Sequence, residues 1–157
     1  MVCTISGDVL HSGAKIIVHQ LNTRGKMGAG LAKRIKEEIL SPEQYQNYVD
    51  DCKKFGSDLL GFCRYDEVVI DGNPTKLVGI YAQNKTGRQP GKIYTKYDAL
   101  TAGLKNIRSV AEPNGWDVAI PYKIGCGLGG GDWTVVKDII DRVFDGYPHV
   151  TIYEYHE

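Results

Sequence analysis

The chain has 157 residues with 19 basic and 19 acidic side chains, a length that suits one domain burying about two thirds of the surface its unfolded chain exposes. Because the charges balance and no stretch approaches the roughly 20 apolar residues of a membrane span, we expect a soluble, unprocessed protein without general affinity for nucleic acid or membranes. The four cysteines show neither a CxxC pair nor zinc-site spacing, so we expect reduced thiols and a cytoplasmic environment.

Two short strands and a helix are predicted at the N-terminus. Residues 2–5 and 15–21 are short apolar runs rich in β-branched side chains, which favours strands. Leu31, Ile35 and Ile39 follow at intervals of four, with charged residues between them. That spacing predicts an amphipathic helix, entered through a glycine-containing loop.

A second helix and a β-hairpin are predicted next. Ser41 is a suitable N-cap and Pro42 suits the first helical position, so we expect a helix that reaches Phe55 and stops at Gly56. Three runs with strand patterns follow, at residues 61–65, 67–70 and 76–82. The last two flank strong turn formers at residues 71–74, which predicts a hairpin.

The C-terminal half alternates helices and strands. Leu100, Leu104, Ile107 and Ala111 have helical spacing, and the Pro-Asn-Gly sequence at 113–115 ends that helix. We then expect a strand at residues 117–121, a helix beginning near Trp133 and a strand at residues 149–155. This alternation predicts an α/β fold with a mixed, mostly parallel sheet and helices on both faces. Ligands bind such sheets at the carboxyl ends of the strands, and the loops at residues 25–30 and 125–131 both leave such ends.

The second of these loops has five glycines in the eight residues from Gly125 to Asp132. Glycine-rich turns at helix N-termini hold phosphate through backbone N–H groups, so a nucleotide-like ligand is the leading hypothesis. A dinucleotide fingerprint is only weakly matched, and a Walker A loop is excluded because Gly131 stands where lysine is required. The alternative is a turn whose glycines serve only the strand-to-helix geometry.

Three motifs together resemble the macro domain family: GDV at residues 7–9, HQLN followed by GKMGAGLA at 19–32, and IPYKIGCGLGGGDW at 120–133. The similarity spans nearly the whole chain and is to the branch of ADP-ribosyl-glutamate hydrolases and small phage and bacterial macro proteins. It implies a single macro domain over residues 1–157, with a mixed central sheet flanked by helices in three layers. It implies no metal or cofactor.

The resemblance also implies the ligand, ADP-ribose or an ADP-ribosylated substrate. Asp8 would accept a hydrogen bond from the adenine amino group, residues 22–30 would wrap the distal ribose, and residues 125–131 would cradle the diphosphate. Asp8 as a turn residue and Asn22 as an ordinary loop residue are the alternatives. The implied ligand-binding residues are Asp8, Val9, Asn22, Met27, Gly28, Ala29, Gly30, Gly125, Cys126, Gly127, Leu128, Gly129 and Gly130.

Catalysis is implied by Lys85, which falls near a lysine that acts on the distal ribose carbon in hydrolases of this branch. His19 is a candidate general acid or base, because its reference pKa permits both forms near neutrality, or else a core histidine. Glutamate-ester hydrolases of the family carry an acid where this chain has Gly129, whereas DNA-directed relatives have glycine there and keep the lysine.

The predicted function is therefore hydrolysis of a substituent on the distal ribose of ADP-ribose: a 1″-phosphate, an acyl group or an ADP-ribosyl adduct. The alternative is a non-catalytic ADP-ribose reader or sink, and a Rossmann-type oxidoreductase ranks below both. We expect a monomer. Gly127→Val or Gly129→Glu is predicted to abolish binding with little loss of folding. Arg88 is either a phosphate ligand or an exposed loop residue, and Asp132 is the expected N-cap of the last helix.

Overall fold

The computed structural model describes residues 1–84, 86, 89 and 91–156. Six strands form one sheet in the order β1-β6-β5-β2-β4-β3. Every neighbouring pair is parallel except β3 and β4, which are antiparallel. The strands are β1 (Cys3–Ser6), β2 (Ile16–Asn22), β3 (Cys63–Ile70), β4 (Asn73–Gln83), β5 (Val118–Pro121) and β6 (Val150–Glu154). The predicted mixed, mostly parallel sheet is confirmed.

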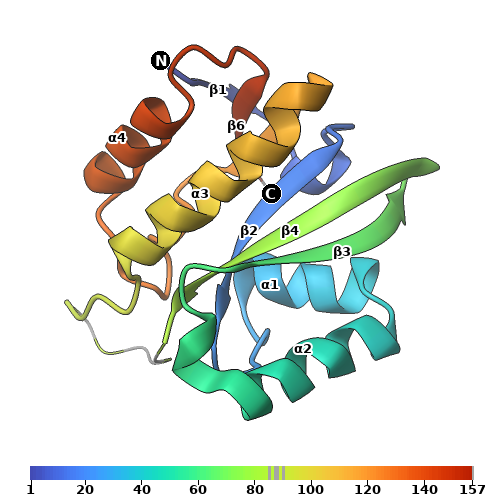
Figure 1. Ribbon diagram of the computed structural model, residues 1–157, viewed down its shortest axis with the longest axis vertical. Helices are drawn as coiled ribbons and strands as arrows, with labels where there is room; N and C mark the ends of the chain where they lie inside the picture. The colour runs from blue at the N-terminus through green and yellow to red at the C-terminus, as the bar shows by residue number, and fades with distance from the viewer. Residues whose placement is uncertain (85, 87–88, 90, 157) are drawn as a thin grey trace.

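Helices cover both faces of the sheet (Figure 1). On one face lie α3 (Tyr97–Ala111) and α4 (Trp133–Val143), and on the other lie α1 (Gly30–Arg34) and α2 (Pro42–Phe55). Successive residues of β2 alternate between the two cores, since Ile16 and Val18 pack in the first and Ile17 in the second. This alternation follows from the two-residue period of a strand and produces the predicted three layers.

The described residues also form four short helical segments: η1 (Val9–His11), η2 (Ile35–Ile39), η3 (Gly56–Leu59) and η4 (Glu112–Asn114). The helix predicted through Ile39 is therefore α1 followed by the π-helical turn η2. The predicted start of α2 is confirmed by a capping box, in which the Gln44 N–H donates to Ser41 Oγ at 3.1 Å and the Ser41 N–H donates to Gln44 Oε1 at 3.0 Å.

The hairpin is tighter than the sequence indicates. The first two predicted strand runs merge into β3, and its turn consists of Asp71 and Gly72, with φ of 52° and 78°. Two-residue hairpin loops require positive φ, which aspartate and glycine tolerate best. Asn73 and Pro74 therefore belong to β4, where Pro74 lies opposite Val69 at the start of the strand.

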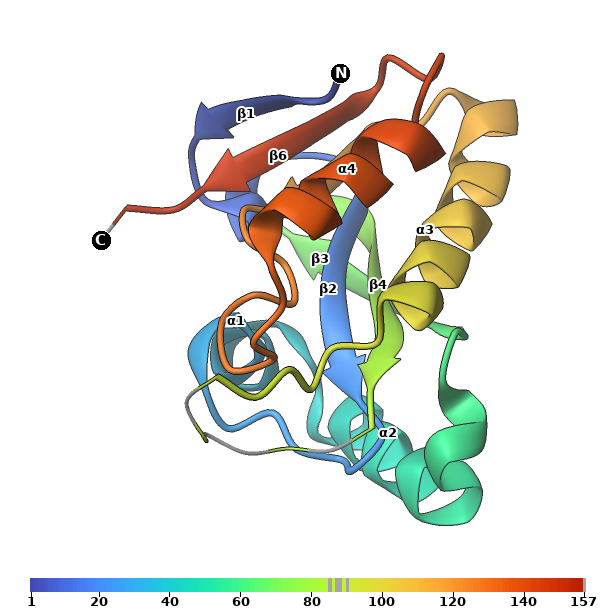
Figure 2. The ribbon, with the colours of Figure 1, turned by 90° about the vertical axis from the view of Figure 1, so that its left-hand side faces the viewer.

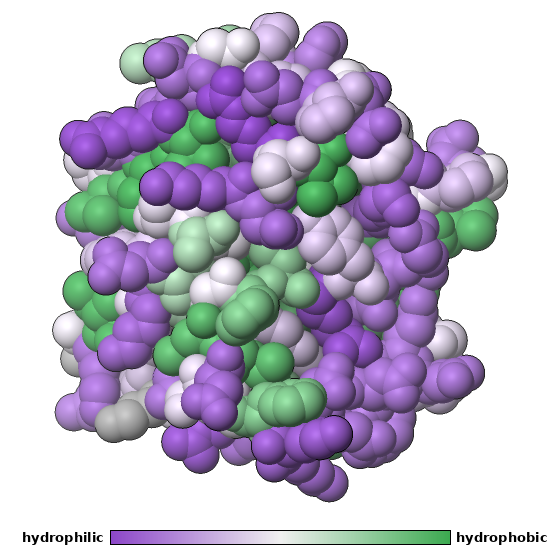
Figure 3. Space-filling model, viewed as in Figure 1, coloured by the Kyte–Doolittle hydropathy of each residue, from purple (hydrophilic) through white to green (hydrophobic). Residues whose placement is uncertain are grey.

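On the face seen in Figure 3, apolar side chains form several patches between hydrophilic residues. Within the described residues, no helix combines the length and apolar character that a bilayer span requires. All four cysteines are free thiols: Cys3, Cys52, Cys63 and Cys126.

Close packing between α3 and β4 leads to a stability prediction. A Cβ atom added at Gly103 would overlap the Ile80 side chain. Overpacking of this kind costs about 1–3 kcal/mol, whereas alanine gains at most about 1 kcal/mol over glycine in a helix. Gly103→Ala is therefore expected to destabilise the fold by about 1 kcal/mol in urea unfolding, and Lys105→Ala, an exposed control on the same helix, should not. Equal stability of wild type and Gly103→Ala would contradict the observed packing.

Candidate functional site

Three adjoining cavities follow the carboxyl ends of the parallel strands. The Asp8 cavity, of about 540 Å³, is lined by Asp8, Arg34 and Tyr155 among others. The central cavity, of about 300 Å³, is lined by both glycine-containing loops, and the Asn22 cavity, of about 440 Å³, adjoins β2 and Thr86. Neighbouring cavities share walls, the first two through Gly30 and Tyr122 and the last two through Gln20 and Leu128. The site is thus one elongated cleft.

Asp8 is held in place by three hydrogen bonds. Its Oδ1 accepts from the Leu10 N–H at 3.1 Å and from Arg34 Nη1 at 3.2 Å, and its Oδ2 accepts from Arg34 Nη2 at 2.7 Å. Burial raises the pKa of Asp8, but the hydrogen bonds from Arg34 and Leu10 outweigh it, so the pKa is lower than usual. The carboxylate is ionised at neutral pH and keeps lone pairs for a ligand.

Arg34 in turn lies 4.7 Å from the centre of the Tyr155 ring. This cation–π contact joins the end of α1 to the residue after β6 and walls the Asp8 cavity on one side. Neither residue was identified from the sequence, because Arg34 is one of several charged residues on α1 and Tyr155 is one of ten tyrosines. Sheet topology brings them together.

The glycine loop, residues 125–131, is built on the segment that precedes α3 (Figure 2). The Gly129 carbonyl accepts from the N–H groups of Tyr94 at 2.7 Å and Thr95 at 3.0 Å. Thr95 Oγ1 donates to the Gly125 carbonyl at 2.7 Å and accepts from Gln20 Nε2 at 3.0 Å. Two carbonyl groups of the loop, those of Gly125 and Gly129, thus anchor it to Tyr94 and Thr95.

The glycines of this loop differ in the space around them: some are packed against neighbouring atoms, and one borders open space. A Cβ atom at Gly129 would overlap Thr95 Oγ1 and lie 2.8 Å from the Gly125 carbonyl oxygen, and one at Gly130 would overlap the Lys92 carbonyl oxygen. At Gly127 no heavy atom lies within 4 Å of such a Cβ. The expectation that Gly129→Glu spares folding is therefore wrong, because the position is packed against Thr95, and Gly127 is the glycine that borders open space.

The backbone N–H groups of this loop form two sets, those with an acceptor and those without one in the described part of the chain. The N–H of Cys126 donates to the Lys123 carbonyl of the preceding turn at 2.9 Å, and those of Gly130 and Gly131 donate to the carbonyls of Gly127 and Gly125 at 3.0 and 2.9 Å. In the described part of the chain, those of Gly127, Leu128 and Gly129 have no acceptor. Three consecutive N–H groups before α4 are thus available to an anion.

Two implied ligand residues in the glycine loop do not line the cleft. Cys126 is half-buried against the core shared by α3 and α4, and a Cβ atom at Gly130 would meet the Lys92 carbonyl. The remaining implied positions each line one or two of the three cavities: Asp8, Val9, Asn22, Met27, Gly28, Ala29, Gly30, Gly125, Gly127, Leu128 and Gly129.

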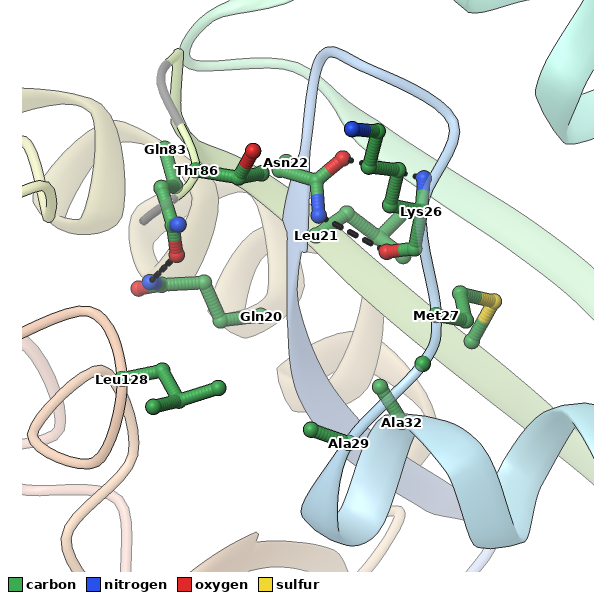
Figure 4. A pocket seen from close by; sticks show the side chains of 11 residues that line it. Gln20, Leu21, Asn22, Lys26, Met27, Ala29, Ala32, Gln83, Thr86 and Leu128 are labelled. Atoms are coloured by element: carbon green, nitrogen blue, oxygen red, sulfur yellow. Dashed lines mark hydrogen bonds between the residues drawn. The ribbon is translucent and has the colours of Figure 1, made fainter. Parts of the chain in front are cut away.

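Asn22 shapes the loop after β2 (Figure 4). Its Oδ1 accepts from the N–H groups of Arg24 at 3.0 Å and Lys26 at 3.2 Å, and its Nδ2 donates to the Lys26 carbonyl at 2.7 Å. The Tyr48 hydroxyl of α2 lies 2.8 Å from the Asn22 carbonyl oxygen and 3.0 Å from Oδ1. One Nδ2 hydrogen is left for a ligand, so the side chain offers mainly a donor rather than a donor and an acceptor.

His19 forms part of the central cavity wall with only 4% of its surface exposed. Burial lowers its pKa to about 4, and Nδ1 has no hydrogen-bond partner among the described residues. The imidazole is therefore neutral at pH 7, contrary to the expectation from its reference pKa that both forms are accessible. A ring with this lowered pKa is a weak base and carries no imidazolium proton to donate near pH 7.

The catalytic candidate Lys85 and the phosphate candidate Arg88 lie outside the described residues. Thr86, which follows Lys85, lines the Asn22 cavity opposite Lys26 and Met27. Asp132 is confirmed as the N-cap of α4, since its carboxylate accepts from the Thr134 N–H at 2.9 Å. Among the residues that the structure describes, no group of three or more His, Cys, Asp or Glu side chains is placed to hold a metal.

Several curated proteins are similar to this chain, and two of them represent two different activities. The DNA ADP-ribosyl glycohydrolase of Mycobacterium tuberculosis is 30% identical over 151 residues, which is 96% of this chain and 40% of that protein. The ADP-ribose 1″-phosphate phosphatase of Saccharomyces cerevisiae is 36% identical over 61 residues, 38% of this chain and 33% of that protein. The chain thus spans at most about 40% of the length of these relatives.

Solved structures share the fold. The macrodomain of Mycobacterium tuberculosis DarG has a TM-score of 0.78 and 25% identity, with 100% of this chain and 98% of that chain covered. Thermosipho africanus DarTG in complex with ADP-ribose has a TM-score of 0.73 and 26% identity, covering 96% of this chain and 40% of that one. No protein-family model matches the chain.

Proposed function

Because the chain belongs to the macrodomain family, we propose that it binds ADP-ribose along the cleft and hydrolyses a bond at the distal ribose. The observation that carries the proposal is the order of the three cavities. An ionised carboxylate lies at one end, three N–H groups without an acceptor among the described residues lie in the middle, and a polar loop lies at the other end. This order matches the order of the three parts of ADP-ribose, which are adenine, diphosphate and distal ribose.

The names of the relatives supply the substrates to test, namely ADP-ribosylated DNA and ADP-ribose 1″-phosphate. In the first reaction the bond between the distal ribose carbon C1″ and the base nitrogen breaks, the water oxygen bonds to C1″, and the base nitrogen takes up a proton. We propose Lys85 as the residue that acts on C1″, supported by its neighbour Thr86 on the cavity wall. The four free thiols support action in a reducing cytoplasm, and we propose a monomer.

A non-catalytic reader is the second candidate, favoured by the lining of the Asn22 cavity. Its described lining residues include no carboxylate and no imidazole, and Lys26 is its one cationic side chain. Gly129 has no room for the acid that some relatives carry. Hydrolysis here therefore depends on a lysine and on water, whereas a reader needs neither.

Calorimetry and turnover assays separate the candidates. Wild type should bind ADP-ribose in the micromolar range and consume at least one of the two substrates. Lys85→Ala should lose about a hundredfold or more in turnover while keeping affinity within about threefold, because a group acting only in the transition state changes rate rather than binding. Lys26→Ala tests the other lysine at this end, and Lys105→Ala on α3 is the neutral control.

Each remaining outcome has a definite meaning. Binding without turnover of any substrate would establish the reader. Loss of turnover in Lys26→Ala but not in Lys85→Ala would transfer the catalytic role to Lys26. Tight binding of NAD with none of ADP-ribose would overturn the proposed function.

A further inference from the structure

The turn that joins β5 to the glycine loop holds a lysine in a left-handed backbone conformation. The Ile124 N–H donates to the Pro121 carbonyl at 3.1 Å, which closes a four-residue turn, and Lys123 occupies its third position with a φ of 59°. A positive φ at this position is typical of a type II turn and favours glycine or asparagine, because a Cβ atom is crowded there. Lysine is an unusual choice for this position.

Glycine is abundant in the residues that follow, with five in the eight residues from Gly125. Among the described residues, Asp71 is the only other non-glycine with positive φ, and it sits in a hairpin turn that favours aspartate. Strained backbone conformations cluster at functional sites, so the residues around Lys123 indicate what its side chain does.

Those surroundings are the central cavity. Lys123 is exposed and lines that cavity together with Gly125 and Gly127. Among the described lining residues it is the only charged side chain, since no carboxylate lines the cavity and His19 is neutral. The cavity therefore combines one positive charge with the three unpaired N–H groups of residues 127–129.

We propose that the Lys123 ammonium group pairs with the diphosphate of the ligand, and that the strained turn is retained because it keeps this charge on the wall of the central cavity. This inference rests on the proposed function, which supplies the diphosphate. A charge-assisted contact adds to what neutral N–H groups provide, and its strength falls as salt is raised.

The test is a substitution expected to move stability and affinity in opposite directions. Lys123→Gly removes the charge and relieves the backbone, so its thermal midpoint should rise by about 2 °C, while its Kd for ADP-ribose should rise about tenfold. Lys123→Arg keeps the charge and should bind within about threefold of wild type. Between low and high NaCl, the Kd of Lys123→Gly should change less than that of wild type.

Asp71→Gly is the matched control, because it relieves the same kind of backbone strain outside the three cavities. Its affinity for ADP-ribose should equal that of wild type. If wild type binds ADP-ribose and Lys123→Gly binds with the same Kd and the same salt dependence, the inference is wrong while the proposed function stands. If wild type does not bind ADP-ribose, the proposed function fails and the inference fails with it.

Discussion

Gly127→Val is expected to weaken ADP-ribose binding about a hundredfold, equivalent to about 2.7 kcal/mol, without changing the thermal midpoint. No heavy atom lies within 4 Å of a Cβ atom at this position, so the valine side chain enters the open space of the central cavity. There it occupies the volume next to the unpaired N–H groups of residues 127–129. Calorimetry measures the affinity, and thermal unfolding of the same sample measures the stability.

Gly130→Val is the matched control three residues away. Gly130 has a φ of 71°, and its added Cβ would overlap the Lys92 carbonyl oxygen, so this variant should lose stability as well as binding. The two variants thus separate the ligand side of the loop from its packed side. Normal affinity in a folded Gly127→Val protein would remove the loop from the binding site.

Acidification from pH 7 to pH 4 is expected to lower the free energy of unfolding by about 3 kcal/mol through His19 alone. Burial lowers the pKa of His19 from 6.5 to about 4. As the pH falls below 6.5, His19 becomes protonated in the unfolded chain but stays neutral in the folded protein. The free energy of unfolding therefore falls with decreasing pH, and the loss levels off below about pH 4, where His19 is protonated in both states. A difference of about 2.5 in pKa, at about 1.36 kcal/mol for each unit, sets the magnitude.

Urea unfolding of wild type and His19→Gln across this pH range measures the effect. The two stability curves should converge as the pH falls, because glutamine cannot titrate. His11→Gln is the control of opposite sign. Exposed His11 donates a hydrogen bond from Nδ1 to Asp71 Oδ2, which raises the pKa of His11, so its small contribution to stability is present at low pH and lost as the pH rises. Parallel curves for wild type and His19→Gln would refute the prediction, as would an NMR titration of His19 with a midpoint near 6.5.

The secondary structure could be predicted from local sequence patterns, because the ends and faces of helices are set by residues close together in the chain. The capping box at Ser41, the N-cap at Asp132 and the apolar spacing of α3 are decided by residues within a few positions. The hairpin was predicted, but its turn was placed over four residues. Only the backbone angles at Asp71 and Gly72 show that two suffice.

The sequence by itself determined the α/β alternation, the two glycine-containing loops and the resemblance that names a ligand, since these are read from residue types and short spacings. Tertiary structure alone decided which glycine of the loop has open space beside it, that burial keeps His19 neutral, and that Lys123 is the one charged side chain among the described residues lining the central cavity. The reason is physical. Packing distance, desolvation and the sign of a local field depend on residues far apart in the chain, such as Thr95 against Gly129, which only the sheet order brings into contact.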